Sequence, residues 1–239
     1  MQVLRLSTQL HKWIALIVGI QVLFWVLGGL VMTAIPIERV RSEHHVAELP
    51  AAPLPLRGLL GLREVAAVAG VAPVEAALKP SPRGPVWVLK PAKGDPVTVS
   101  ALTGTPLASM SPFEVRALAQ RAYRGEGKVV SARLLPQAPQ ETGKTGPLWR
   151  VDFNDAEKTT FYLSPATAEV VSRRSDVWRF YDFFWRLHIM DIEKGENFNH
   201  PLIIVAAVLT LSIVITGFVL LWIKIARDLQ MLKARRAAG

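Results

Sequence analysis

Histidine is the residue type in this chain whose side chain supports the widest range of chemistry. There are five histidines, at positions His11, His44, His45, His188 and His200. Paired imidazoles are common axial ligands of b-type haem in helical bundles. His11 precedes one long apolar stretch, whereas His188 and His200 precede a second one. A stretch that crosses a bilayer separates its ends by about 30 Å, so His11 cannot share one haem iron with either of the other two.

We therefore treat His11, His188 and His200 as candidate ligands of haem b, with two arrangements open. One chain could use His188 together with His200, or two chains in a homodimer could pair equivalent histidines. The alternative is that these are interfacial histidines that hydrogen-bond to lipid headgroups or to the backbone. The sequence alone leaves both interpretations open.

The adjacent residues His44 and His45 lie next to a proline-rich stretch. No carboxylate cluster and no further histidine at ligand spacing accompanies them in the sequence, which argues against a metal site. Asp152, Asp155 and Glu157 surround one predicted hairpin, where we expect a solvated turn rather than a pair of catalytic carboxylates. The chain also has no cysteine, no G-x-S-x-G and no H-E-x-x-H sequence. The residue types therefore favour a non-enzymatic role and exclude thiolate chemistry and covalent c-type haem.

Two long uncharged stretches dominate the organisation of the chain. Of its 239 residues 51% are hydrophobic, and its mean hydropathy is +0.29. About 20 apolar residues cross a bilayer, so we predict transmembrane helices at residues 13–37 and 200–224, flanked by residues 1–12 and 225–239. A cleaved signal peptide is the alternative for the first stretch, but its apolar part is longer than the usual 7–15 residues.

The excess of positive over negative charge lies mainly at the two ends of the chain. These ends carry seven Lys and Arg residues against one Asp, whereas residues 38–200 carry 21 basic and 18 acidic residues. An excess of positive charge beside a span marks its cytoplasmic side. We expect a two-pass protein of the bacterial inner membrane, with both termini cytoplasmic and residues 38–200 periplasmic. The basic tail is then a topology signal and a contact for anionic lipid, which argues against a nucleic-acid partner.

The middle segment begins with a predicted linker at residues 38–56 and continues with a repeated unit. Helical spacing over residues 57–71 precedes three short strand patterns, and the same order returns after the helix-start signal at Ser111. The strand patterns cover residues 74–78, 85–90, 96–100, 128–135, 148–153 and 159–163. We predict an α+β membrane protein whose two spans flank a tandem α-β-β-β domain, with repeats at residues 57–108 and 109–174.

The second repeat resembles the PepSY domain. The similar residues are LWRVDF at Leu148–Phe153 and TFYLSPATAEV at Thr160–Val170, where Ala168 stands at a position that is usually Gly in this family. The flanks, LHKW at Leu10–Trp13 and WRLHIMD at Trp185–Asp191, resemble PepSY-associated membrane proteins. The resemblance implies a link to inhibition or regulation of peptidases. For larger members it implies a link to iron uptake and haem-dependent ferric reduction.

Residues 175–192 are rich in aromatic side chains and show helical spacing. We predict an amphipathic helix at the outer surface of the bilayer, where aromatic rings are favoured. Arg179, Asp182 and Arg186 share one face at spacings that allow ion pairs. Two roles remain open, a clamp to the bilayer and a docking surface for a partner membrane protein. The side chains expected at this interface are Trp178, Phe180, Tyr181, Phe184 and Trp185.

Together these observations favour an accessory or regulatory binding module that engages a membrane or periplasmic partner, with a role in iron or metal homeostasis. One alternative is a haem b redox component linked to reduction of ferric iron or siderophores. The other is a periplasmic peptidase inhibitor. The expected partners are the lipid bilayer and either a second copy of the chain or a membrane protein complex.

Overall fold

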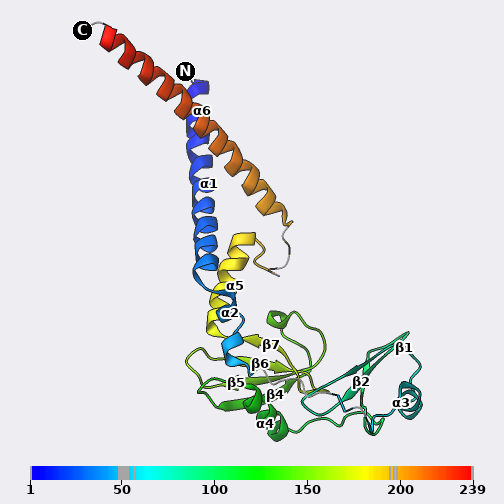
Figure 1. The fold of residues 1–239 in the computed structure, drawn as a ribbon. Coiled ribbons are helices and arrows are strands. Elements are labelled where there is room, and N and C mark those ends of the chain that lie inside the picture. The colour runs from blue at the N-terminus through cyan, green and yellow to red at the C-terminus, as the bar shows by residue number, and fades with distance from the viewer. Residues whose placement is uncertain are drawn as a thin grey trace. The chain divides into compact units, whose positions relative to one another are not determined.

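The computed structural model describes residues 2–47, 54–55, 57–193, 195, 197 and 199–237. Side chains are described for the same residues except 2–12, 14, 216, 219, 220 and 237. Figure 1 shows the order of the elements along the chain. The chain divides into a helical unit, residues 1–35 with 181–239, and an α+β unit, residues 36–180.

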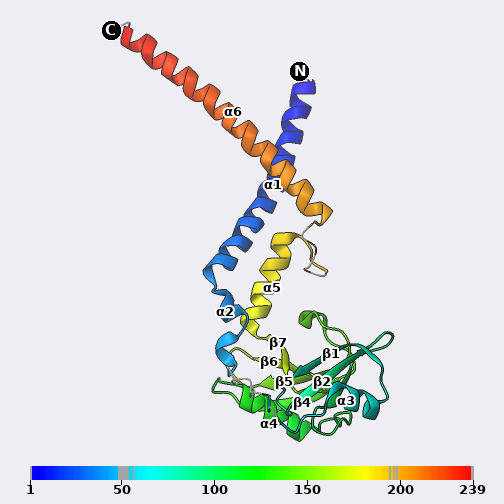
Figure 2. The same cartoon turned by 45° about the vertical axis from the view of Figure 1, so that its right-hand side comes forward.

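The helical unit consists of α1 (Gln2–Ala34), the second half of α5 (Asp176–Ile189) and α6 (Pro201–Ala237). The stretch Ala15–Ala34 of α1 has 20 residues and a mean hydropathy of 2.3, which suits a membrane span. Within the described residues, the apolar part of α6 is Pro201–Ile215, which is shorter than a span. Figures 1 and 2 both show the second half of α5 beside α1.

The end of α1 is set by a proline. The residue before a proline disfavours the helical conformation, and α1 stops at Ala34, just before Ile35 and Pro36. A separate short helix, α2 (Ile37–Val40), follows. The continuous helix therefore ends before residue 37, the predicted end of the span.

The α+β unit holds two antiparallel sheets, which confirms the predicted α+β class. The first sheet has the order β1-β2-β3, and its strands are β1 (Pro73–Lys79), β2 (Val86–Pro91) and β3 (Val97–Ser100). α3 (Leu62–Ala69) packs on β2. Val65, Leu89 and Val99 form the small core between them.

α3 is shorter than the predicted helix at residues 57–71. It begins after Gly61, whose N–H donates to the Glu64 carboxylate at 2.8 Å, and it ends at Gly70 in the left-handed conformation. Leu60, predicted to be helical, instead donates its N–H to the carbonyl of Ala101 at 2.9 Å. Leu60 therefore bonds to the turn that follows β3 and lies outside the helix.

The second sheet has the order β4-β5-β6-β7. Its strands are β4 (Val129–Leu135), β5 (Leu148–Phe153), β6 (Thr160–Leu163) and β7 (Val170–Arg174). The sequence pattern predicts three strands, and β7 is an addition to them. β7 is an edge strand that ends in two arginines, and edge strands often carry charge, which weakens the alternating pattern.

α4 (Pro112–Ala122) begins after Ser111, as predicted. The N–H of Glu114 donates to the Ser111 hydroxyl at 3.3 Å, and the N–H of Ser111 donates to the Glu114 carboxylate at 2.7 Å. This reciprocal pair satisfies two backbone donors that have no partner within the helix. The Ser111 N–H and the Ser111 hydroxyl, which lies 2.8 Å from the same carboxylate, lower the pKa of Glu114 by hydrogen bonding to it.

The main core lies between α4 and the four-stranded sheet. Trp149, Val151 and Phe153 of β5 are 5%, 0% and 3% exposed and form its buried face, because they alternate with Arg150 and Asp152 along the strand. They pack with Phe161 of β6 and with Tyr123, which follows α4. The Tyr123 and Phe153 rings are stacked with centroids 4.0 Å apart.

The predicted linker is wrong for residues 38–46. These residues include most of α2 and the 3-10 helix η1 (Glu43–His45), and Val46 forms a β-bridge with Tyr123. Val40 and Ser42 are 2% and 0% exposed, so the segment packs within the α+β unit instead of running free. Residues 48–53 and 56 of the predicted linker, which include Pro50 and Pro53, lie outside the described residues.

A substitution at Ala168, between β6 and β7, tests the left-handed backbone conformation at this position. Its φ is +61°, and the left-handed region costs a residue with a Cβ about 1–2 kcal/mol. Ala168→Gly relieves that strain and removes one buried methyl worth about 0.8 kcal/mol. We expect the free energy of unfolding to stay unchanged or to rise by up to about 1 kcal/mol.

The matched control is Ala119→Gly, in the buried face of α4. It should lower the free energy of unfolding by about 2 kcal/mol, through helix propensity and the lost methyl. Urea unfolding of the full chain in detergent, followed by tryptophan fluorescence, measures both variants. A greater loss for Ala168→Gly than for Ala119→Gly would contradict the left-handed geometry.

Candidate functional site

Two reciprocal hydrogen bonds join α1 to α5 in the helical unit. The indole Nε1–H of Trp25 donates to Nε2 of His188 at 3.0 Å, and Nδ1 of His188 lies 2.9 Å from the carbonyl oxygen of Trp25. A nitrogen that accepts from an indole is unprotonated, and a nitrogen facing a carbonyl carries the proton. These contacts assign His188 as the neutral Nδ1–H tautomer, with both ring nitrogens engaged.

Glycines allow this close approach. A Cβ at Gly28 would lie 3.2 Å from Cβ of His188 and 3.2 Å from the carbonyl oxygen of Phe184. A Cβ at Gly29 would lie 3.7 Å from Cε1 of His188. Small residues at helix contacts let two backbones pack closely in membrane proteins. Gly28 and Gly29 therefore form the surface of α1 against which α5 packs.

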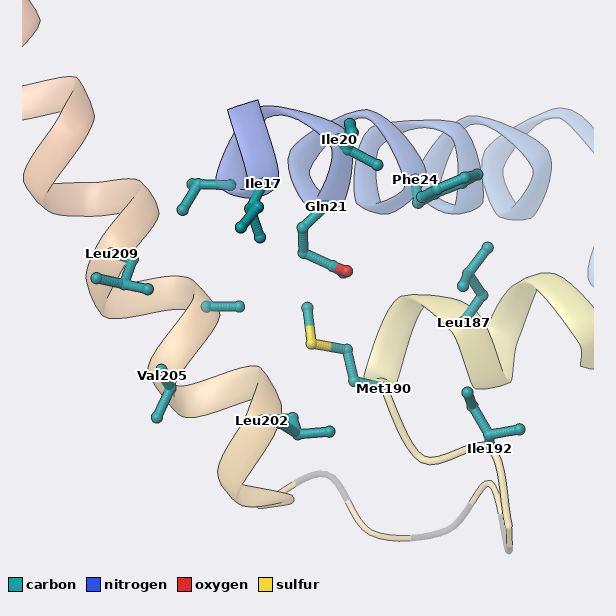
Figure 3. Close-up of a pocket in the computed structure, with 12 residues that line it drawn as sticks. Ile17, Ile20, Gln21, Phe24, Leu187, Met190, Ile192, Leu202, Val205 and Leu209 are labelled. Carbon is teal, nitrogen blue, oxygen red and sulfur yellow. The ribbon is translucent and has the colours of Figure 1, made fainter. Parts of the chain in front are cut away.

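An apolar pocket of about 480 Å³ lies among α1, the end of α5 and the start of α6. Figure 3 shows its walls as sticks. α1 contributes Ile17 and Phe24, α5 and the turn after it contribute Leu187 and Met190, and α6 contributes Val205 and its neighbours on the same face. The pocket is therefore lined by side chains from three helices that lie apart in the sequence.

Gln21 of α1 is the one amide side chain among the described residues that line this pocket. Its Nε2 is buried and has no hydrogen-bond partner among those residues. Figure 3 shows the carboxamide directed from α1 toward Met190. A buried amide donor without an acceptor is costly in apolar surroundings. The pocket therefore combines an apolar wall with a single hydrogen-bond donor that lacks a partner.

The three candidate haem ligands lie in different settings. His188 is engaged by Trp25 through both ring nitrogens. His200 immediately precedes α6, and its Nδ1 accepts a long hydrogen bond of 3.4 Å from the N–H of Leu202. His11 lies within α1, and its side chain is outside the described part of the chain.

The aromatic side chains of α5 have distinct contacts. Arg174 lies over the Trp178 ring at 4.1 Å, and Trp185 donates its indole N–H to the carbonyl of Gly195 at 3.0 Å. The carbonyl of Phe184 faces Gly28 of α1. Phe180 is 51% exposed and Tyr181 is half-buried. In the helical unit, α5 therefore packs partly on protein, and its contact with lipid or a partner stays a prediction.

The charged face of α5 forms ion pairs at the predicted spacing. Arg186 contacts Asp182, four residues earlier, at 2.6 Å. Arg179 instead contacts Asp176 at 3.2 Å and Glu141 at 3.5 Å. The prediction that these charges can pair along the helix is confirmed for Arg186 and Asp182.

Carboxylates lie beside His44 and His45 in the structure, although no carboxylate cluster accompanies them in the sequence. Within the α+β unit, Nε2 of His45 lies 3.4 Å from Glu157 and 3.6 Å from Asp155, and Nε2 of His44 lies 3.6 Å from Glu157. Asp155 and Glu157 belong to the hairpin between β5 and β6, which the sequence suggested was only a solvated turn. No local pattern could have revealed this group, because its two halves are more than 100 residues apart.

Comparison with protein families gives a match over nearly the whole chain. A family model described as the PepSY-associated TM region matches residues 8–239. No curated protein and no solved structure gives a match.

The contact between α1 and α5 can be tested at Gly28. We expect Gly28→Leu to lower the free energy of unfolding by about 1–3 kcal/mol, because the larger side chain collides with His188 and the Phe184 carbonyl. Gly19→Leu is the matched control, since nothing lies within 4 Å of a Cβ at Gly19. Thermal unfolding in detergent, followed by circular dichroism, compares the two variants. Equal stability would contradict the close packing.

Proposed function

The chain belongs to the PepSY-associated transmembrane family, and from this premise we propose that it is an accessory module that binds a partner membrane protein. The family supports a membrane-anchored protein of the PepSY type. The observation that carries the docking role is the unpartnered Nε2 of Gln21 in the pocket among α1, α5 and α6.

The proposed topology has two spans, with both termini cytoplasmic and residues 38–200 periplasmic. α1 supplies the first span. Residues 201–223 contain no charge, and basic residues follow them, which supports α6 as the second. We place the role of the module in iron or metal homeostasis, the association that the family resemblance implies.

The chemistry of the pocket favours a protein partner over a lipid tail. The hydrocarbon region contains no water to accept from Gln21, and an unsatisfied polar group there costs several kcal/mol. An acyl chain fills apolar space but offers no acceptor. A partner transmembrane helix offers both apolar side chains and an acceptor, from Ser, Thr, Asn or Gln or from a backbone carbonyl. We therefore assign the pocket to such a helix.

The alternative proposals have less support. In the described conformation His188 does not fit an axial ligand of haem b, because Trp25 occupies both of its ring nitrogens. A haem at His188 would require this contact to break. The peptidase-inhibitor proposal rests on the family resemblance alone.

Site-specific photo-crosslinking tests the docking proposal. A photoreactive residue at Ile17 lines the pocket, whereas one at Leu30 lies on α1 outside the pocket residues. We expect the Ile17 probe in intact cells to crosslink one membrane protein, and the Leu30 probe not to do so. Gln21→Leu should abolish the Ile17 product, because it removes the hydrogen-bond donor and keeps the pocket apolar.

The crosslinked species decides among the occupants of the pocket. A product formed only with lipid, or one that persists in Gln21→Leu, would refute the proposal. A product formed only with a second copy of the chain would replace the partner protein by a homodimer. Unchanged thermal stability of Gln21→Leu is the check that the helical unit still folds.

An absorption spectrum tests the haem alternative. We expect protein purified from cells supplied with a haem precursor to have the same Soret absorbance as His188→Gln, because Trp25 engages both ring nitrogens of His188. Spectra are recorded oxidised and after reduction with dithionite. A Soret band with sharp α and β bands that His188→Gln abolishes would establish the alternative instead.

A further inference from the structure

A compact group of nitrogen and oxygen donors lies in the α+β unit. The ligand atoms of His44, His45 and Glu157 all lie within 4.8 Å of one another. Nε2 of His45 also lies 3.6 Å from Oδ2 of Asp155. Bonds of about 2.0–2.2 Å to a tetrahedral ion separate its ligands by about 3.3–3.6 Å. The separations of 3.4 and 3.6 Å between the histidines and the carboxylates match that spacing.

The two halves of the group are held by their own elements. His44 and His45 are consecutive residues of η1, whose position is fixed by a hydrogen bond from the N–H of Arg124 to the carbonyl of His45 at 2.9 Å. On the hairpin, the Asp155 carboxylate accepts from the N–H of Thr159 at 2.7 Å and from its hydroxyl at 2.5 Å. The donors are therefore placed before any ion binds.

The two oxygens of the Glu157 carboxylate face different partners. Its Oε1 lies 3.3 Å from Nη2 of Arg39, while its Oε2 faces both histidines. Two carboxylates, those of Asp155 and Glu157, therefore face the histidines, whereas Arg39 is the one guanidinium among the described residues that contacts them, and this arrangement favours a bound cation.

Tyr123 provides an independent indication of a ligand. It is 6% exposed, and its hydroxyl makes no hydrogen bond of acceptable geometry with the described residues. The ring stacks on His45 with centroids 5.6 Å apart, and both residues line a cavity of about 630 Å³.

Gly125 keeps the space beside this hydroxyl open. A Cβ at position 125 would collide with the Tyr123 hydroxyl and would lie 2.9 Å from Nδ1 of His45. Any larger residue would therefore displace the tyrosine or the histidine. A water or anion held on a bound ion would give the hydroxyl its missing partner.

We propose that His44, His45 and Glu157, assisted by Asp155, bind a divalent transition-metal ion. Two imidazoles and carboxylate oxygens suit first-row transition ions, whereas Mg²⁺ and Ca²⁺ prefer sites built from oxygen alone. The ion joins η1 to the hairpin between β5 and β6. This site goes beyond the partner-binding role and does not depend on it.

Cobalt titration of the purified full chain, in detergent and without an affinity tag, tests the site. We expect Co²⁺ to bind with one ion per chain and to produce visible d–d bands, which Zn²⁺ abolishes by competition. His45→Gln and Glu157→Gln, which change separate segments, should each weaken binding at least about tenfold. The controls are Glu43→Gln in the same turn and His200→Gln, a histidine of the helical unit, and both should bind like the wild type.

Hydrogen exchange locates the ion. We expect Zn²⁺ to slow exchange in residues 37–46 and 154–159, and to leave α3 unchanged. Absence of cobalt bands, or equal affinity in the wild type and both site variants, would overturn the proposal. Slowing confined to other segments would also overturn it. Circular dichroism of each variant shows that any lost binding does not result from unfolding.

Discussion

The ring of Tyr123 connects the core of the α+β unit to residues 37–46, which precede that core in the chain. It stacks both on Phe153, deep in the core, and on His45. Its backbone forms the bridge with Val46. Because stacking and bridging occur at the same residue, the burial that stabilises the sheet also places the histidines beside Asp155 and Glu157.

The helical unit depends on a comparable contact. Trp25 and His188 satisfy each other's hydrogen-bonding groups, and Gly28 removes the side chain that would keep α5 away from α1. With α5 held there, Leu187 and Met190 become a wall of the apolar pocket. The same histidine thereby acts as a structural residue in the described conformation, which explains why the haem interpretation has less support.

Unpaired polar atoms mark both proposed sites. The buried side-chain atoms without partners, among the described residues, belong to Gln21, Ser42 and Tyr123. Gln21 lines the apolar pocket of the helical unit, and Tyr123 lines the cavity beside the histidines. Ser42 lies at the start of η1. Since leaving a buried polar group unpaired costs free energy, such atoms are the places where a ligand or partner contributes most to stability.

Local patterns in the sequence determined the apolar stretch of α1, the start of α4 at Ser111 and the buried face of β5. Each of these depends on residues two to four positions apart, where periodicity and capping act. Only the tertiary structure decided the pairing of Trp25 with His188 and of His45 with Glu157, which are 163 and 112 residues apart. Such contacts arise from the way the chain returns on itself, and no spacing within a short segment reports them.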